Sequence, residues 1–273
     1  MTVRDRASLP RVPQTIVVYA TRERARALAR DAFPRRRCRT VFVRDAAELG
    51  RTFCAGLVDA ALIDLGGGSE DAWRAAAIAR DFPTVAFFGV LPIRPADSSA
   101  VARCASLEFV DVIAEGVDDV AVRELVLPHG FTARFAAALK EPPPALALES
   151  LVQRRTWQCV VAYAGRTIRT EEIATCQGVT REHLSRTFST SGGPNLKRII
   201  DLVRLIAAAE LSKNPGYDVG DVARVLGFAS SSHLSSTAQR VVGTRPASLA
   251  RLRTVDLLER FTHGRGRSRA SAL

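Results

Sequence analysis

The sequence predicts an α/β N-terminal domain followed by an all-α C-terminal domain, in a chain of 273 residues. Three observations support this prediction. Short apolar runs alternate with helical stretches over the N-terminal half. A run of three prolines, Pro142–Pro144, then interrupts the pattern. After it only helical periodicity remains, and one segment occurs twice. The length suits two domains, and the apolar content of 47% is enough to fill two cores.

The N-terminal domain is predicted to hold five strands that alternate with helices. The strands are short runs of β-branched or apolar residues, at Thr15–Ala20, Thr40–Val43, Asp59–Asp64, Thr84–Phe88 and Phe109–Ile113. Ala-rich and Arg-rich stretches of helical length lie between them, among others at Arg22–Ala32, Ala46–Ala55 and Ser69–Asp81. This alternation favours a parallel sheet covered on both faces, of the size of a flavodoxin-like domain.

Prolines and composition set the expected domain limits. Pro128 is expected to end or kink the last helix of the sheet domain, and Thr132–Lys140 predicts one more helix. The three prolines favour an extended, semi-rigid spacer, and the basic, Gly- and Ser-rich C-terminus predicts disorder. The resulting limits are an arm at residues 1–14, an α/β domain at 15–140, a linker at 141–149, a helical domain at 150–255 and a tail at 256–273.

The repeated segment predicts two helix-turn-helix units. Ala174–Phe188 and Ala223–Ala238 both run from Ala through Gly to His-Leu-Ser, with Gly178 and Gly227 at equivalent places. The small Ala lets two helices cross closely, and the Gly can adopt the positive φ of a tight turn. Leu148–Ala164 predicts a helix before the first unit. Such units place their second helix in the major groove of DNA.

Between the two units, Leu196–Lys213 has apolar residues at helical spacing, so we expect a packed helix that acts as a strut. The net charge of +11 also points to a polyanion. Residues 1–140 contribute +3 and residues 141–273 contribute +8, so the excess lies with the repeat. No apolar run approaches the roughly 20 residues of a membrane span, which favours nucleic acid over membrane. A solvated basic surface is the alternative.

The N-terminal residues lack the apolar stretch of a secretory signal, so we expect a cytoplasmic protein. The five cysteines include no CxxC pair, and reduced, mostly buried thiols are expected at Cys38, Cys54, Cys104, Cys159 and Cys176. No zinc signature, nucleophile elbow or HExxH helix is found, so the sequence predicts no metal, no cofactor and no enzymatic activity. A hidden catalytic site in the N-terminal domain is the alternative.

Residues 150–253 resemble the DNA-binding domain of AraC/XylS-type regulators. In the second unit the matching residues are Val222-Ala223, Gly227-Phe228, Ser232, Leu234-Ser235, Gly243-Thr244-Arg245-Pro246 and Arg251. In the first unit they are Ile173-Ala174, His183–Phe188 and Gly193. The resemblance implies a transcription regulator that binds double-stranded DNA. RNA polymerase and a second copy of the chain, bound through the N-terminal domain, are further candidate partners.

The second helix of the first unit offers the best candidates for base contacts. Its inner face, with Leu184 and Phe188, is apolar, so the opposite face is expected to meet DNA. A guanidinium at Arg186 can donate two hydrogen bonds to guanine, a contact worth about 1 to 3 kcal/mol of discrimination. Ser185 and Glu182 point outward with it. Glu182 either accepts from a cytosine amino group or pairs with Arg186. Arg181 is expected to meet phosphate or to pack locally.

The second unit departs from the family pattern. The family commonly has Arg and then an aromatic residue where this chain has Ser236 and Ala238. Serine side chains discriminate bases weakly. We therefore expect the first unit to read the sequence, and the second to contact phosphates through Arg240 and helix N-terminal amides. The polar side chains that it offers to DNA are Ser231, Ser232, Ser235 and Ser236.

The N-terminal domain resembles a response-regulator receiver, with Asp64 at the place of the phosphoacceptor. The rest of that chemistry is missing. Tyr19 and Ala20 stand where acidic residues hold Mg²⁺, Phe88 replaces a hydroxyl residue, and Glu115 replaces a lysine. The sequence thus predicts a degenerate receiver with Asp64 as a vestigial phosphoacceptor. It governs assembly or binds a signal without phosphotransfer.

Two other functions remain open at this stage. One is an interaction adaptor that binds DNA with little sequence preference. The other is a response regulator that is controlled by phosphorylation of Asp64. The glycines that follow Asp64, Gly66–Gly68, lack the Lys-Ser/Thr ending of a phosphate-binding loop and are interpreted as a flexible loop.

Overall fold

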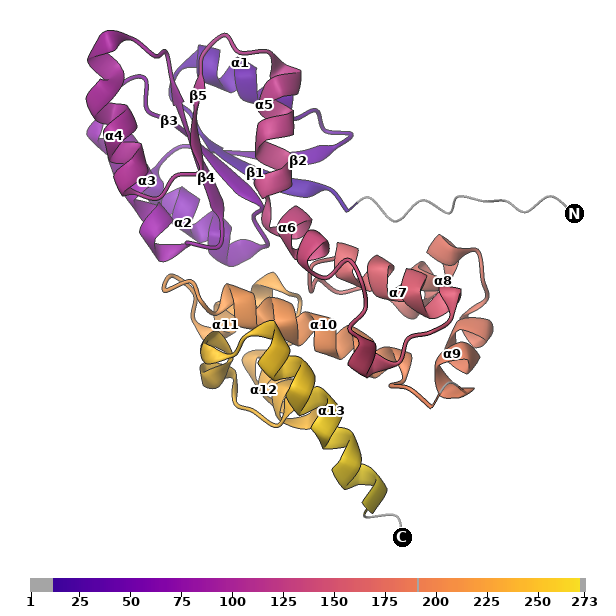
Figure 1. Ribbon diagram of the computed structural model, residues 1–273. Helices are drawn as coiled ribbons and strands as arrows, with labels where there is room; N and C mark the ends of the chain where they lie inside the picture. Colours follow the sequence, from indigo (N-terminus) through magenta and orange to yellow (C-terminus); the bar gives the residue numbers. More distant parts are fainter. Residues whose placement is uncertain (1–11, 191, 271–273) are drawn as a thin grey trace, which may run out of the picture. The chain divides into compact units, whose positions relative to one another are not determined.

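The computed structural model describes residues 12–190 and 192–270, apart from the side chains of residues 96 and 264–270 (Figure 1). The chain forms two compact units, which we describe separately. The sheet unit consists of Pro13–Arg134 together with Lys213–Asp221. The helical unit consists of Phe135–Ser212 and the chain from Val222 onward.

The sheet unit contains one sheet of five parallel strands in the order β2-β1-β3-β4-β5. The strands are β1 (Gln14–Tyr19), β2 (Cys38–Val43), β3 (Ala60–Asp64), β4 (Ala86–Leu91) and β5 (Asp111–Ala114). This is the flavodoxin-like order, so the predicted fold class is confirmed. Every residue of β3 and β4 is buried, as expected of central strands covered on both faces.

Five helices lie on the two faces of this sheet: α1 (Glu23–Ala32), α2 (Ala46–Ala55), α3 (Glu70–Ala77), α4 (Ser98–Ser106) and α5 (Asp119–Val126). Helices α1 and α5 pack together on one face, and α2 and α3 lie together on the other (Figure 1). Side chains of Asp45, Ser69 and Asp118 accept from backbone N–H groups and so fix where three of the helices begin. Short 3₁₀ turns add Ile78–Asp81, Pro95–Asp97 and Leu127–His129.

The helical unit is built around α10 (Leu196–Leu211), whose residues are almost all buried. This helix is the strut that the apolar spacing predicted. The other helices are α6 (Phe131–Ala138), α7 (Leu151–Ala162), α8 (Thr170–Gln177), α9 (Arg181–Thr190), α11 (Val219–Val225), α12 (Ser231–Val242) and α13 (Thr254–Ala270). The first residues of α6 and of α11 belong to the sheet unit. A 3₁₀ segment, Pro246–Arg251, precedes α13.

The structure corrects the expected linker. Residues 141–149 were expected to be an extended spacer, but they include a 3₁₀ turn at Pro144–Leu146 and belong to the helical unit. Leu146 and Leu148 are buried in that unit. The helical unit also begins earlier than expected, at Phe135, and the indole Nε1 of Trp157 donates to the Leu139 carbonyl at 2.7 Å. Burial of these apolar side chains stabilises a folded segment, even though three prolines favour an extended one.

The expected disordered tail is also wrong over its first part. Residues 256–263 lie in α13, and Leu257 and Phe261 of this helix are fully buried. These two residues are four apart, so they share one face of a helix and anchor it. The Arg198 guanidinium lies over the Phe261 ring, 4.8 Å from its centre. Residues 271–273 of the expected tail, and residues 1–11 of the expected N-terminal arm, lie outside the described residues.

Candidate DNA-binding surface and the carboxyl edge of the sheet

The two predicted helix-turn-helix units share one turn geometry. Gly178 follows α8 with φ of 64°, and Gly227 follows α11 with φ of 67°. In each unit the residue after the glycine donates a backbone hydrogen bond across the turn. Val179 N donates to Ala174 O at 3.1 Å, and Phe228 N donates to Ala223 O at 2.8 Å. These are the bonds of a helix C-terminus closed by a left-handed glycine, which accounts for the Gly at the same place in both copies.

In the first unit, α9 is held by its apolar face. Leu184 and Phe188 are buried, and the Thr180 hydroxyl accepts from the His183 backbone N–H at 3.1 Å at the start of the helix. The predicted base-contacting residues lie on the opposite face, where Glu182, Ser185 and Arg186 are all exposed. The sequence pattern therefore identified which face of α9 is available to a partner.

The charged residues of α9 differ in what they contact. Arg181 forms an ion pair with Glu171 of α8, at 3.0 Å. Among the residues that the structure describes, no ion pair joins Glu182 to Arg186. Within the described part of the chain Arg186 pairs with no other carboxylate either, which leaves its planar donor group available for bidentate recognition.

In the second unit, the Ser230 hydroxyl caps α12 by accepting from the His233 N–H at 3.1 Å. Leu234 and Ala238 are buried, and Ala238 stands four residues after Leu234, as Phe188 does after Leu184. The predicted DNA-facing serines behave unequally. Ser231, Ser232 and Ser236 are exposed, whereas Ser235 is half-buried.

Two charged residues of the strut fasten the second unit, and sequence reasoning missed both. Asp201 accepts from the Arg240 guanidinium at 2.8 Å, so the residue expected to contact phosphate is tied to α10. Arg204 donates to the Leu226 carbonyl at 3.0 Å and lies 3.8 Å from the centre of the Phe228 ring. Burial lowers the pKa of Arg204. Both Asp201 and Arg204 are charged residues within the apolar stretch of α10, and this pattern could have indicated that each pairs with a partner in the helical unit.

At the carboxyl edge of the sheet, Asp64 ends β3 with its side chain buried. Its carboxylate accepts from three donor groups of Arg22: Nε at 2.9 Å, the backbone N–H at 3.1 Å, and the end of the guanidinium. The Gly66 N–H donates to the same carboxylate at 3.2 Å. Arg22 also forms an ion pair with Glu115, which follows β5. One guanidinium therefore serves two nearly buried carboxylates.

The Arg22 guanidinium is tightly enclosed and remains charged. A Cβ on Gly66 would collide with the Arg22 guanidinium, so only glycine leaves room for it. Burial by itself lowers the pKa of Arg22, but hydrogen bonding and charge attraction from Asp64 and then Glu115 outweigh it, and the pKa is raised. Arg22 stays charged at any physiological pH. The sequence analysis did not single out Arg22, which lies 42 residues from Asp64 in the chain.

These residues do not fit a Mg²⁺ site. Mg²⁺ needs oxygen ligands in an octahedral arrangement, and here a guanidinium lies directly against Asp64. Tyr19 and Ala20 supply no carboxylate at the end of β1. One detail of the sequence analysis is corrected: Phe88 lies within β4, opposite Leu62, and the strand ends at Leu91, which also has no hydroxyl.

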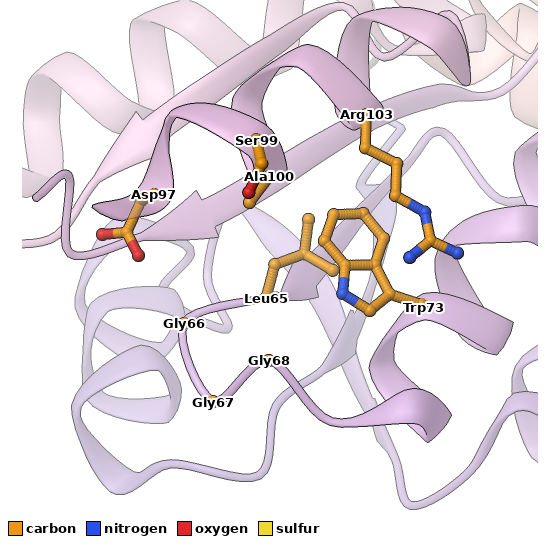
Figure 2. A pocket seen from close by; sticks show the side chains of 9 residues that line it. All are labelled: Leu65, Gly66, Gly67, Gly68, Trp73, Asp97, Ser99, Ala100 and Arg103. Atoms are coloured by element: carbon orange, nitrogen blue, oxygen red, sulfur yellow. The ribbon is translucent and has the colours of Figure 1, made fainter. Parts of the chain in front are cut away.

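Beside this edge the Gly66–Gly68 loop lines an open pocket of about 400 Å³, shown in Figure 2. Trp73 of α3 and Arg103 of α4 form its other wall, with the guanidinium 4.3 Å from the centre of the indole ring. Asp97 and Ser99 complete the polar lining. The lining therefore holds side chains of both charges, Asp97 and Arg103.

Comparison with known proteins assigns part of the chain. A family model described as a helix-turn-helix domain matches residues 173–251. Over these residues the resemblance to AraC-type helix-turn-helix domains is confirmed. A search of curated proteins found no match. No helix among the described residues is both long enough and apolar enough to span a bilayer.

Three solved structures are similar to this chain. A response regulator from Thermotoga maritima is 14% identical with a TM-score of 0.38, over 43% of this chain and 98% of that one. A response regulator from Burkholderia pseudomallei, with a phosphorylated aspartic acid, calcium ion and citrate, is 16% identical with a TM-score of 0.36, over 63% and 97%. Full-length FixJ from B. japonicum is 12% identical with a TM-score of 0.38, over 83% and 96%. The sheet unit has the flavodoxin-like strand order, which receiver domains share.

Proposed function

We propose that this protein is a sequence-specific transcription regulator of the AraC/XylS type, in which the sheet unit binds a signal or a partner without transferring a phosphoryl group. The exposed face of α9, on which Arg186 pairs with no carboxylate of the described residues, is the observation that supports sequence reading most directly. No residue is assigned a catalytic role.

The two helix-turn-helix units have different roles in DNA binding. The first unit presents a long guanidinium side chain at Arg186, which reaches base edges. The second presents the short side chains of Ser231, Ser232 and Ser236, with Ser235 half-buried, and its Arg240 is ion-paired with Asp201. We infer that the second unit positions the protein on the phosphate backbone, through Arg240 and the amides at the start of α12.

The Arg22 cluster supports the proposed absence of phosphotransfer. An aspartate that accepts a phosphoryl group needs a free carboxylate oxygen and a metal ion to neutralise the charge that develops. Here the Asp64 carboxylate is occupied by Arg22, and a second carboxylate, Glu115, stands beside the same guanidinium. The Arg22 guanidinium already neutralises charge on these carboxylates, so no metal ion is needed for that purpose.

The partners of this regulator are double-stranded DNA and, in our proposal, RNA polymerase and a second copy of the chain. Dimerisation through the sheet unit would double the number of DNA-reading units. It is not required for binding, because two helix-turn-helix units held about one helical turn apart can engage one face of a duplex.

Selection from a randomised duplex library tests the proposal. Purified full-length protein is used at about 150 mM salt, where non-specific binding is weak. We expect an enriched motif that loses definition at one position in Arg186→Ala. Arg181→Ala is the matched control on the same helix, because Arg181 is paired with Glu171 and is not expected to read bases, so its loss should leave the motif unchanged. An unchanged motif in Arg186→Ala would show that another residue reads the bases.

The serine-rich α12 favours one alternative, an adaptor that binds DNA with little sequence preference. Steep salt dependence with no enriched motif would support the adaptor, because phosphate contacts alone give that pattern. Control by phosphorylation would instead appear as a gain in mass with acetyl phosphate that is lost in Asp64→Asn.

A further inference from the structure

The connection between α10 and α11 belongs to the sheet unit. In sequence, residues 213–218 lie between the strut and α11, and residues 219–221 are the first turn of α11. In the structure they form one compact unit with residues 13–134. We call Asn214–Tyr217 the anchored turn, because each of its contacts described below is made to the sheet unit.

Hydrogen bonds hold the start of the anchored turn. Asn214 is only 1% exposed, and its side chain forms a reciprocal pair with Thr84. The Thr84 backbone N–H donates to Asn214 Oδ1 at 2.9 Å, and Asn214 Nδ2 donates to Thr84 Oγ1 at 2.7 Å. Gly216 N donates to the Asp81 carbonyl at 2.9 Å. A side-chain amide satisfied in this way fixes both the position and the direction of the turn.

An aromatic stack holds the end of the turn. The Tyr217 ring meets the edge of Phe82 at a centroid distance of 4.9 Å and an angle of 73°, and Phe82 stacks on Phe53 of α2 at 4.5 Å. The Tyr217 hydroxyl donates to the Phe53 carbonyl at 3.2 Å. Phe53 in turn lies 5.8 Å from Phe87 of β4. Tyr217 thus continues the aromatic core of the sheet unit.

Gly216 is required where the turn approaches that core. A Cβ at this position would lie 2.5 Å from Cζ of Phe82 and 2.8 Å from Cε2. Any side chain would therefore push Phe82 or the turn away. The contact is made by the backbone itself, so its geometry does not depend on a flexible side chain.

We propose that the anchored turn couples the sheet unit to DNA binding by fixing how the second helix-turn-helix unit leaves the strut. Helix α10 ends at Leu211 and α11 begins at Val219, so the anchored turn is most of the chain between them. Because the turn contacts Phe53 of α2 and residues 81–84 before β4, we expect displacement of either segment to move it. The inference rests on the proposed function, since it assumes that both helix-turn-helix units bind the same DNA duplex.

Variants that release the turn test the coupling in the full-length protein. Gly216→Val displaces the turn from Phe82, and Thr84→Val removes one hydrogen bond to Asn214 from the sheet side without altering the helical unit. Gly220→Ala is the matched control, because its Cβ would meet only the Asp218 side chain, at 3.1 Å. Each is assayed on the duplex selected by the wild type and on duplexes with the spacing between the two contacted segments changed by a few base pairs.

We expect both release variants to change affinity for the selected duplex, or the preference for its spacing, by about fivefold or more, the lower range of measured coupling between sites. Gly220→Ala should match the wild type. Unchanged affinity and spacing preference in Gly216→Val and Thr84→Val would overturn the proposal and leave the turn a structural anchor only.

Hydrogen exchange gives a readout that does not depend on sequence-specific binding. Because coupling is reciprocal, a duplex of random sequence at about 50 mM salt should change exchange at the Gly216 and Thr84 amides of the wild type. No change on DNA binding would overturn the coupling even if a motif is found. Failure to enrich any motif, with exchange altered by the random duplex, would refute sequence-specific function while supporting the coupling.

Discussion

Arg22 and Asp64 form the central charge pair of the sheet unit: Nε of Arg22 lies 2.9 Å from Oδ1 of Asp64, and the Arg22 backbone N–H lies 3.1 Å from Oδ2. The pair joins the segment after β1 to the end of β3. Receivers are expected to place acids after the first strand and a cation after the fifth. Here the cation follows β1 and the acid, Glu115, follows β5, so the charges are exchanged between the two places.

Removal of Arg22 should destabilise the protein. Arg22→Ala leaves the fully buried Asp64 and the nearly buried Glu115 side chains without their shared cation. We expect the free energy of unfolding to fall by about 3 kcal/mol, as for other broken buried pairs. Urea denaturation followed by circular dichroism measures it.

Arg30→Ala is the control for this change. Arg30 pairs with Glu23, and both side chains are more than half exposed, at 51% and 75%. Such a pair is worth less than about 1 kcal/mol. Equal losses in the two variants would mean that the Asp64 cluster contributes no more than a surface ion pair.

Gly66→Ala should disturb the same cluster without removing a charge. The new Cβ would occupy the space of the Arg22 guanidinium, so the arginine must move away from Asp64. We expect a loss of about 1 to 3 kcal/mol in the free energy of unfolding. Gly67→Ala is the matched control, because no atom lies within 4 Å of its Cβ position. If chemical denaturation gives the two variants the same free energy of unfolding, a Cβ at residue 66 does not disturb the Arg22 cluster.

Alanine substitutions in α12 should alter base preference little. Replacing Ser232 or Ser236, which are exposed, removes only a short hydroxyl from the surface of the helix. We expect less than about 1 kcal/mol of change in discrimination at any base pair, against about 1 to 3 kcal/mol for Arg186→Ala. Competition binding with single-base variants of the selected duplex measures both. A larger effect from the serines would reverse the proposed roles of the two units.

Cys104 should resist alkylation in the folded protein. Burial raises the pKa of its thiol to about 11, so at pH 8 the protonated form predominates and only about one molecule in a thousand carries the reactive thiolate. Iodoacetamide labelling followed by mass spectrometry should show that Cys104 reacts at least about a hundredfold more slowly than in urea. The rate should rise with pH towards 11. Rapid labelling at pH 8 would show that this part of the sheet unit opens readily.

Local patterns in the sequence determined the elements of both units. Alternating apolar runs gave five strands within a few residues of their observed limits, because strand formation there depends on continuous burial. The repeated Ala and Gly positions predicted both helix-turn-helix turns, since a positive φ at Gly178 and Gly227 is a local requirement. The exposed face of α9 followed from the apolar spacing of Leu184 and Phe188.

Only the tertiary structure determined which residues from distant parts of the chain contact one another. Arg22 meets Asp64, Arg240 meets Asp201, and Tyr217 joins the aromatic core around Phe82. Leu257 and Phe261 order a segment whose composition predicted disorder. In each case the stabilising contact depends on which surfaces the fold places side by side. Composition and periodicity describe one element at a time, so they specify the helices and strands but not the charges and rings that meet between them.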